Sequence, residues 1–360
     1  MRVLDKLIKK FTTKKLEALR KKEVVYSVVN RTPNHAKKIV YALPALRYPC
    51  GGNIVANNYV DVINALQYKG FTAAVLYAQE PSFNPTLFKY NSPLKTDLTF
   101  DPAKEFIIVP EIFALSNTRT LIENRIPYAI SVLNGYIMEL EMSIGFGDFT
   151  QLQRVYEQAA FIISVSDDTT ANIKMAFPKC ADKIIKAPYV IDKAKYIPLA
   201  QKKNTITYMP RKLARHSALV LHLLGDKLPK HWQLVPIDGV TEQEVYDIFT
   251  ESKIFLSFSE LEGLAMPPVM AAMSGNLVIG YSGEGNKEIM HLSCFEEVMC
   301  GDIKDFVEKL LKAVERFDQN QVEIDYQAID YLSNKFSQHA LDAFLKELMD
   351  HVDHALVRNA

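Results

Sequence analysis

Short apolar segments alternate with helical or glycine-containing segments along most of the chain, and this alternation constrains the fold more than any other feature. In the first half, the apolar segments are KKIVYALPAL, FTAAVLYA, EFIIVPEIF (105–113), IPYAISVL (126–133) and AAFIISVS (159–166). Each has the length of a buried strand and is followed by polar or helical sequence. Strands that alternate with helices in this way predict an α/β fold with a parallel, doubly wound sheet.

A second series of the same kind follows the polar, Lys-rich stretch AQKKN (200–204). Its predicted strands are NTITYMP, HWQLVPID, KIFLSFS and NLVIGY, and its first helices are LARHSALVLHLLGDKL and TEQEVYDIFTES. Thr241, with Glu244 three residues later, has the pattern of a capping box at the start of the second helix. The tail from Ser337 onward has a helical pattern.

The length of 360 residues suits two domains rather than one core. We predict a first Rossmann-like domain over residues 23–200 and a second over residues 201–340. A C-terminal helix over residues 341–360 is expected to cross back to the first domain.

Residues 1–22 form a basic segment in a chain whose formal net charge is zero. They contain nine Lys or Arg against two Asp or Glu. An apolar stripe recurs at helical spacing at Leu4, Leu7, Ile8, Phe11, Leu16 and Leu19, with lysines on the other face. Two interpretations stay open: a basic amphipathic helix on the anionic inner membrane, or a solvated helix whose stripe packs on its own domain.

Composition argues against several classes of protein. A net charge of zero gives no general bias toward nucleic acid, and no apolar run approaches the roughly 18 residues that span a bilayer. No signal-peptide core follows the basic start, so we expect a cytoplasmic protein, and docking of residues 1–22 would make it peripheral on the inner membrane. The scattered cysteines form no CxxC pair and no HExxH motif occurs, so we expect reduced thiols and no bound metal.

Ligands of open α/β sheets bind beyond the carboxyl ends of the strands, so loops there are candidate sites. The first is Cys50-Gly51-Gly52-Asn53, whose two glycines let the backbone approach a ligand, although a simple turn is the alternative. The second runs from Tyr208 to Lys212. Its adjacent cations Arg211 and Lys212 suit a diphosphate group, with plain surface charge as the alternative.

The third loop is part of SELEGLAMPPVMAAMSG (259–275). Gly263 indicates a tight loop, Pro267 or Pro268 suits the first turn of a helix, and Gly275 suits its end. Glu260 and Glu262 precede that helix, and either could face a polyhydroxyl ligand. The later segment GYSGEGNKE predicts a glycine loop at Gly283 and Gly285, or a plain connection.

Together these loops resemble those of the retaining GT-B glycosyltransferases, in particular the family 4 group that builds bacterial surface polysaccharides. CGGN is similar to that family's first glycine-rich loop, and Pro210-Arg211-Lys212 to its basic residues after the first strand of the second domain. Residues 262–275 resemble its EGFGLPPxEAMAxG segment, and residues 283–288 its GGxxE-like loop. The resemblance covers about residues 38–345 and is strongest over 204–290.

The chain departs from the family pattern at two positions. Of the family's two glutamates, spaced eight apart, Glu262 fills the first position but Met270 fills the second. Ala265 stands where the family usually has glycine. In the family the first glutamate contacts the donor sugar and the second the ribose, so the resemblance implies a site without its ribose-binding carboxylate. Glu260 or Glu288 could supply that carboxylate from a neighbouring loop.

The resemblance implies a GT-B fold, with two Rossmann-like domains facing each other across a cleft. It implies transfer of a hexose or deoxyhexose, with retention and without a metal or cofactor. The donor would be a nucleotide-sugar in the second domain, and the acceptor a glycan or lipid-linked glycan of lipopolysaccharide or capsule in the first. A GT-B-fold sugar-nucleotide epimerase and a non-catalytic GT-B partner protein are the alternatives.

The resemblance also implies a set of site residues. The implied catalytic residues are Arg211, Lys212 and Glu262, with the cations stabilising the departing diphosphate. The loop amides near Ala265 to Pro268 would meet the donor or its phosphates. The implied substrate-binding residues are Gly51, Gly52, Asn134, Met209, Pro210, Gly263, Leu264, Ala265, Met266, Pro267, Met270, Gly283 and Glu288.

Overall fold

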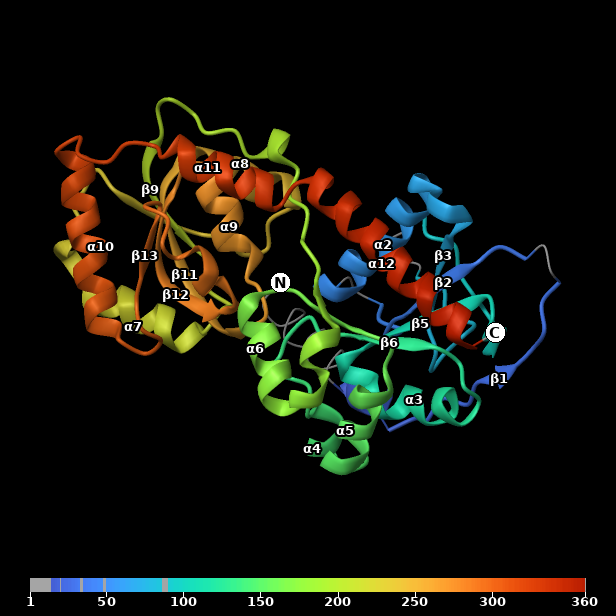
Figure 1. Ribbon diagram of the computed structural model, residues 1–360. Coiled ribbons are helices and arrows are strands. Elements are labelled where there is room, and N and C mark those ends of the chain that lie inside the picture. Colours follow the sequence, from blue (N-terminus) through green and yellow to red (C-terminus); the bar gives the residue numbers. More distant parts are fainter. Residues whose placement is uncertain (1–13, 20, 33–34, 48–49, 86–89, 360) are drawn as a thin grey trace. The chain divides into compact units, whose positions relative to one another are not determined.

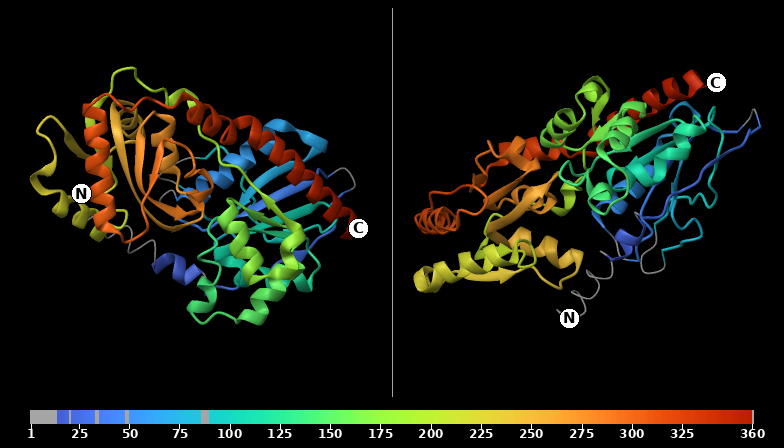
Figure 2. Two further views of the ribbon diagram at one scale, coloured as in Figure 1. Left: turned by 60° about the vertical axis from the view of Figure 1, so that its left-hand side comes forward. Right: turned by 90° about the horizontal axis from the view of Figure 1, so that it is seen from below.

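A computed structural model describes residues 14–19, 21–32, 35–47, 50–85 and 90–359 (Figures 1 and 2). The chain divides into two compact units. Unit 1 takes the chain up to Val165, together with Thr169–Ala187 and Leu341–Ala360. Unit 2 takes Ser166–Asp168 and Pro188–Ala340.

Unit 1 is built on a parallel six-stranded sheet of order β3-β2-β5-β6-β7-β8. Its strands are β2 (Lys38–Ala42), β3 (Thr72–Leu76), β5 (Glu105–Pro110), β6 (Tyr128–Ser131), β7 (Ile162–Ser164) and β8 (Ile184–Lys186). A separate parallel pair consists of β1 (Ser27–Val28) and β4 (Thr99–Phe100). The five strands predicted for the first half are therefore present, and β8 was not predicted.

Both faces of this sheet are covered, which explains why its strands are apolar without alternation. Val40 and Ala42 of β2 face one core cluster, which includes Leu121. On the other face, Tyr41 contacts Tyr59 edge-to-face at 6.3 Å. The helices of this unit are α2 (Gly51–Leu66), α3 (Ala114–Glu123), α4 (Leu140–Ser143), α5 (Phe149–Gln158) and α6 (Asp167–Ala176), with most of α12 (Gln338–Asn359).

The C-terminal helix α12 packs on unit 1 from Leu341 onward, as predicted. Phe344 lies 6.1 Å from the ring of Tyr59 on α2, and Asp353 forms an ion pair with Lys37. Figures 1 and 2 show α12 running alongside α2. Because these contacts join the end of the chain to its beginning, α12 is part of the first domain's core.

Unit 2 is built on a parallel five-stranded sheet of order β10-β9-β11-β12-β13. Its strands are β9 (Lys203–Tyr208), β10 (Gln233–Pro236), β11 (Ser252–Glu262), β12 (Leu277–Glu284) and β13 (Phe295–Glu297). Its helices are α7 (Ala214–Leu224), α8 (Glu242–Glu251), α9 (Met266–Met273), α10 (Ile303–Asp318) and α11 (Tyr326–Lys335). The four predicted strands are present, and the capping box of Thr241 and Glu244 is formed.

Each face of the unit 2 sheet has its own hydrophobic cluster. Phe255 and Val278 face α8, α9 and α11, whereas Leu256 and Ile279 face α7 and α10. Figure 1 shows these helices in two layers on either side of the sheet. Unit 2 is thus a second three-layer α/β domain, as the sequence predicts.

The second domain begins at Pro188, earlier than the boundary predicted at residue 200. Ile191 and Tyr196 are buried in the α8–α9–α11 cluster of unit 2, and the Ile191 N–H donates to the Phe336 carbonyl at 2.9 Å. The predicted boundary followed the polar stretch at 200–204, but the hydrophobic residues before it already pack on the second domain.

Most of the predicted N-terminal amphipathic helix, residues 1–13 and 20, lies outside the described residues. Residues 14–19 are helical, Leu19 is buried, and Leu16 packs against the core of unit 1. This end of the apolar stripe therefore packs on its own domain, and membrane binding of the remainder stays a prediction.

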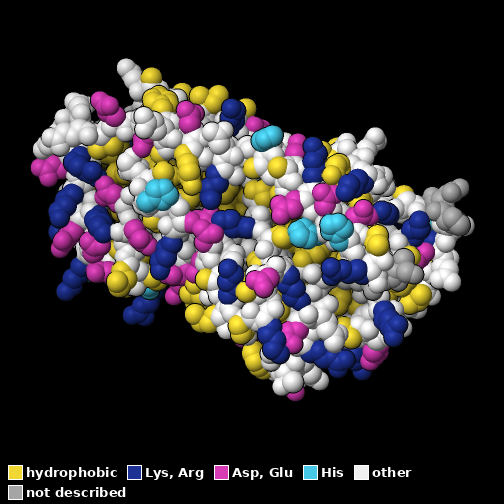
Figure 3. All heavy atoms as spheres, viewed as in Figure 1, with side chains coloured by type: hydrophobic (Ala, Val, Ile, Leu, Met, Phe, Trp, Pro, Cys, Tyr) yellow, Lys and Arg dark blue, Asp and Glu magenta, His cyan; other side chains and the backbone are white. Residues whose placement is uncertain are grey.

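No helix in the described part of the chain has both the length and the apolar character needed to cross a membrane. On the visible face of the molecule, Lys or Arg and Asp or Glu side chains are intermixed (Figure 3). This intermixing agrees with the formal net charge of zero.

Candidate functional site

The carboxyl ends of the five parallel strands of unit 2 meet at one edge of its sheet, and two predicted catalytic residues are in contact there. Lys212 lies in the turn after β9, and Glu262 ends the neighbouring strand β11. The Lys212 ammonium forms an ion pair with the Glu262 carboxylate. Their side chains are 39% and 25% exposed, so both remain accessible to a ligand.

Arg211 is exposed beside this pair. Within the described ranges its side chain forms no hydrogen bond or ion pair. The turn that carries it is fixed by the Lys212 N–H, which donates to the Met209 carbonyl at 3.0 Å, and by Leu213 in the left-handed region at φ 40°. The site therefore offers one free guanidinium next to one paired ammonium.

Helix α9 begins at the same edge, but its first turn provides fewer amide donors than we predicted. Pro267 and Pro268 have no N–H, and the Ala265 N–H donates to Asn286 Oδ1 at 2.7 Å. The usual anion site of a helix N-terminus depends on free amides, so phosphate binding here depends more on the side chains of Arg211 and Lys212.

Three predicted binding residues place their side chains in the core. Met209 and Leu264 are buried in the α8–α9–α11 cluster, and Met266 packs against it. The side chains of Met209 and Leu264 therefore shape the loops from within, whereas that of Met266 remains partly exposed.

The loops after β11 and β12 approach so closely that glycine is required in one of them. A Cβ on Gly285 would lie 1.9 Å from the Gly263 carbonyl oxygen. Gly283 has φ +65°, which only glycine adopts at little cost. The two glycine loops of the sequence thus form one rigid contact next to Glu262.

Besides Glu262, three positions were predicted for a carboxylate or its replacement, and two of them, Met270 and Glu288, have structural contacts. Met270 is half-buried and packs against the α8–α9–α11 cluster. Glu288 is 8% exposed and pairs with Lys335 at 2.9 Å. Glu288 is therefore held toward α11, whereas Glu260 is exposed.

Two of the three residues predicted in the first domain line a hollow of about 210 Å³ at the carboxyl ends of β2, β5 and β6. Gly52 and Asn134 line it, whereas Gly51 does not. A Cβ on Gly52 would lie 2.9 Å from Leu133 Cδ1, but one on Gly51 would meet nothing within 4 Å. A side chain at position 52 would therefore displace the end of the Leu133 side chain, whereas one at position 51 would displace nothing.

The polar groups of this hollow are few. The Glu111 carboxylate is buried and accepts the N–H groups of Leu133 and Asn134, both at 3.1 Å. Burial raises the pKa of the Cys50 thiol, so the thiol form is favoured over the thiolate. The remaining lining is largely aliphatic and aromatic, which suits the apolar face of a ligand.

Sequence reasoning missed several residues at the unit 2 edge. Asn286 is fully buried and binds both backbone groups of Ala265. The His216 ring lies 3.2 Å from the Tyr281 hydroxyl, which connects α7 to β12. Asp238 and Gly239 follow β10 at the same edge, a position that the rule of strand carboxyl ends could have found.

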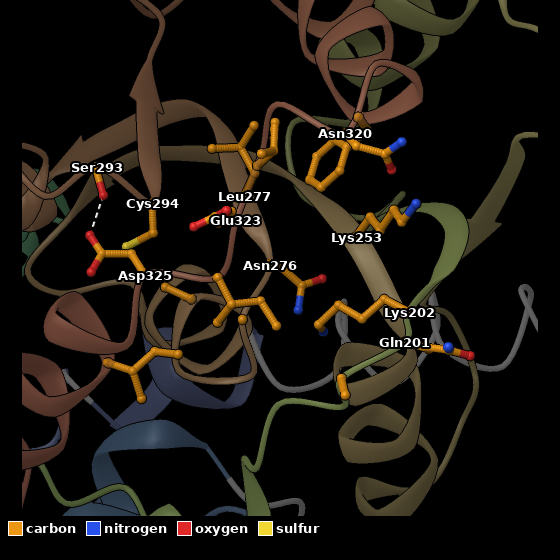
Figure 4. Close-up of a pocket in the computed structure, with 17 residues that line it drawn as sticks. Gln201, Lys202, Lys253, Asn276, Leu277, Ser293, Cys294, Asn320, Glu323 and Asp325 are labelled. Carbon is orange, nitrogen blue, oxygen red and sulfur yellow. Dashed lines mark hydrogen bonds between the residues drawn. The ribbon is translucent and has the colours of Figure 1, made fainter.

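A second hollow, of about 560 Å³, lies at the amino ends of the unit 2 strands (Figure 4). Lys202 Nζ donates to the carbonyls of Phe249, Thr250 and Ser252 at 3.2, 2.9 and 2.8 Å, and so caps the end of α8. Burial lowers the pKa of Lys202 to about 7. In Figure 4, Asn276 lies between the two lysines and the Ser293–Asp325 pair.

Among the described residues, no three His, Cys, Asp or Glu side chains are grouped so that they could hold a metal ion.

No protein-family model matches the chain. It is 25% identical over 284 residues to an alpha-1,6-glucosyltransferase of Actinobacillus pleuropneumoniae serotype 7. This match covers 75% of the chain and 81% of the relative.

Three solved structures are similar in fold. Sucrose-phosphate synthase from Thermosynechococcus elongatus has a TM-score of 0.64 at 10% identity, over 89% of this chain and all of that one. Anabaena HepE, in complex with UDP and glucose, has a TM-score of 0.63 at 12% identity, over 88% and 100%. The lipopolysaccharide outer core galactosyltransferase WaaB has a TM-score of 0.58 at 14% identity, over 88% and 99%. The chain thus has the predicted α/β fold of the GT-B type.

Proposed function

We propose that the protein is a retaining glycosyltransferase, similar to family 4, that moves a sugar from a nucleotide-sugar to a glycan or lipid-linked acceptor of a bacterial surface polysaccharide. The observation that carries this proposal is the free Arg211 beside the Lys212–Glu262 ion pair at the carboxyl edge of unit 2. These three side chains supply the charges that glycosyl transfer from a diphosphate requires.

The leaving diphosphate gains negative charge as its bond to the anomeric carbon breaks and the acceptor hydroxyl oxygen bonds to that carbon, and the hydroxyl proton would pass to an oxygen of the leaving diphosphate. Arg211 would bind two phosphate oxygens in a planar, bidentate manner, and Lys212 would add a second cation. Fixed charges directed at a developing anion are usually the largest catalytic contribution. The proposal therefore assigns leaving-group stabilisation to side chains and requires no metal ion.

Glu262 would accept hydrogen bonds from hydroxyl groups of the donor sugar. Its ion pair with Lys212 is partly exposed and contributes roughly 0–1 kcal/mol, so a diphosphate can compete for the ammonium at little cost. Donor binding would then turn Lys212 toward phosphate and free carboxylate oxygens for the sugar. The pair would thus hold both side chains at the site before the donor arrives.

One structure of similar fold supports uridine diphosphate as the nucleotide of the donor. HepE was solved with UDP, with UDP and glucose, and with UDP-glucose. We infer a UDP-hexose donor here, bound at unit 2, and an acceptor bound at the apolar hollow around Gly52 and Asn134 in unit 1.

The test is acceptor-dependent release of UDP from UDP-glucose or UDP-galactose, with membrane-derived glycans as acceptors. We expect transfer to continue in EDTA, and Arg211→Ala to lower kcat about 100-fold or more. Proton NMR of the product would give the anomeric configuration, and an inverted centre would overturn retention. UDP release that does not depend on an acceptor, or no release from any nucleotide-sugar, would overturn transferase activity.

A further inference from the structure

A hollow of about 640 Å³ lies on unit 1 where the chain leads into β6, β7 and β8. It is therefore at the amino edge of the sheet, opposite the edge that carries Gly52 and Asn134. The segments 121–128, 158–161 and 351–358 form its walls, together with Lys183.

Every charged or ionisable lining residue of this hollow, apart from Tyr128, is basic. The basic residues are Arg125, Lys183, His351, His354 and Arg358, and the lining includes no Asp or Glu. Four other hollows in the described part of the chain include at least one Asp or Glu each. In a chain of zero formal charge, this is a local concentration of positive charge.

The fold brings these residues together from three elements. His351, His354 and Arg358 recur at three- and four-residue spacing on α12, which places them on one face. Arg125 follows α3 with φ 53°, a left-handed conformation that turns the chain into β6. Figure 3 shows two histidine side chains side by side over α12, with Lys or Arg side chains below them and Asp or Glu side chains above them.

Three of the basic side chains are available to a ligand. Among the described residues, Arg125, His354 and Arg358 form no side-chain hydrogen bond or ion pair. Lys183 Nζ instead donates to the carbonyls of Glu157 and Ala159 at 2.7 and 2.8 Å, and burial lowers its pKa.

The acidic groups on the surrounding elements are paired with other cations. Asp350 binds Lys69 at 2.7 Å, Glu157 binds Lys179 at 3.1 Å, and Asp353 pairs with Lys37. Glu347 Oε1 lies 3.9 Å from His351 Nε2, and Asp350 interacts electrostatically with His354. These acids are therefore partly neutralised by their own cations, and none of them lines the hollow.

We propose that this basic hollow, defined by Arg125, His354 and Arg358, binds a multiply charged phosphate group. Two guanidinium groups can each bind phosphate oxygens bidentately, and the imidazole adds a further donor. The phosphate belongs either to a soluble molecule or to the headgroup of an anionic lipid. Either source makes unit 1 an anion-binding domain at the edge away from the proposed acceptor hollow.

The test uses the full chain and inorganic pyrophosphate in isothermal titration, with saturating UDP present to occupy the proposed donor site. We expect binding that weakens with salt. The double variant Arg125→Asn/Arg358→Gln should lower the affinity about tenfold or more, because it removes both bidentate partners. Asn tolerates the left-handed backbone at position 125. Lys346→Gln, an exposed lysine on α12 that does not line the hollow, is the matched control and should have no effect.

Flotation with phosphatidylglycerol and phosphatidylcholine vesicles distinguishes the two sources. A lipid headgroup predicts binding to phosphatidylglycerol vesicles that the double variant loses, and a soluble phosphate predicts loss of pyrophosphate binding alone. Equal losses of pyrophosphate affinity in the double variant and in Lys346→Gln would overturn the proposal. It would also be overturned if the double variant lost neither pyrophosphate binding nor vesicle binding. If UDP fails to bind while pyrophosphate binding still depends on Arg125 and Arg358, the donor site is wrong and this site stands.

Discussion

The side-chain amide of Asn286 binds both backbone groups of Ala265: Oδ1 accepts its N–H at 2.7 Å, and Nδ2 donates to its carbonyl at 2.8 Å. The loop after β12 thereby fixes the start of α9. Ala265 has φ −85° and ψ 114°, an ordinary extended conformation. The residue that departs from the family's glycine therefore adopts a backbone that any residue can adopt, and its position depends on Asn286.

Asn286→Ala should destabilise unit 2. The substitution leaves the N–H and carbonyl of Ala265 buried without partners, which costs about 2–4 kcal/mol in total. Urea unfolding followed by the fluorescence of Trp232, the single tryptophan, reports on this unit. Gln327→Ala, an exposed position on α11, is the control. Equal midpoints for both variants would contradict the role of Asn286.

Met270→Glu should fold and bind UDP at least as well as the wild type. Met270 is half-buried against the α8–α9–α11 cluster, so the carboxylate should cost about 1–2 kcal/mol of stability. A carboxylate accepts ribose hydroxyl groups better than a thioether does. Titration of UDP and dTDP checks this, with Met270→Leu as the packing control. Loss of all nucleotide binding in the Glu variant alone would show that helix α9 is misaligned with the family.

Lys202 should make the stability of unit 2 rise with pH above neutrality. Burial lowers its pKa to about 7, below the value of roughly 10.4 in an unfolded chain. Between these two pKa values the unfolded chain holds a proton that the folded chain lacks. The free energy of unfolding therefore increases with pH over this range and is lower near pH 7. The slope is at most about 1.4 kcal/mol per pH unit.

Lys202→Met removes this proton linkage, so the difference in unfolding free energy between wild type and variant should grow from pH 7 to pH 9. Trp232 fluorescence in urea at several pH values measures it. Parallel pH profiles for the two proteins would contradict a lowered pKa at Lys202.

Much of this fold was predictable because its strands are short apolar runs that both faces of a sheet bury. β8 and β13 were missed because each has only three residues and lies at a sheet edge. The sequence of β13, FEE, also contains no apolar run. The domain boundary was placed too late because polarity at 200–204 was taken as a linker. The hydrophobic Ile191 and Tyr196 had already joined the second core.

The candidate site was predictable only in its charged residues. Arg211 and Lys212 follow the end of β9 and Glu262 is the last residue of β11, which is a pattern visible in sequence. Asn286 carries no such pattern, since its role depends on two loops that meet only in the folded chain. The core positions of Met209 and Leu264 were hidden for the same reason, because apolar loop residues can face either a ligand or the core.

Deleting residues 1–13 should abolish flotation with phosphatidylglycerol vesicles and leave UDP binding intact. This deletion keeps Leu16 and Leu19, which pack on unit 1. Wild-type binding should weaken with salt, because the lysines of this segment attract anionic lipid. A second variant replaces Lys6, Lys9 and Lys10 by Gln, which removes the lysine charges of the segment without shortening the chain. Unchanged flotation after the deletion would refute membrane docking by this segment.

The central claim, that Arg211 and Lys212 bind the donor diphosphate, is tested most directly by titrating UDP and uridine into the wild type and Arg211→Ala/Lys212→Ala. Arg215→Ala, an exposed arginine at the start of α7, is the control. We expect UDP to bind the wild type and the control at least about 100-fold more tightly than uridine, because the diphosphate meets two cations. In the double variant this ratio should fall close to one while uridine affinity is unchanged. An unaltered ratio in the double variant would contradict the claim.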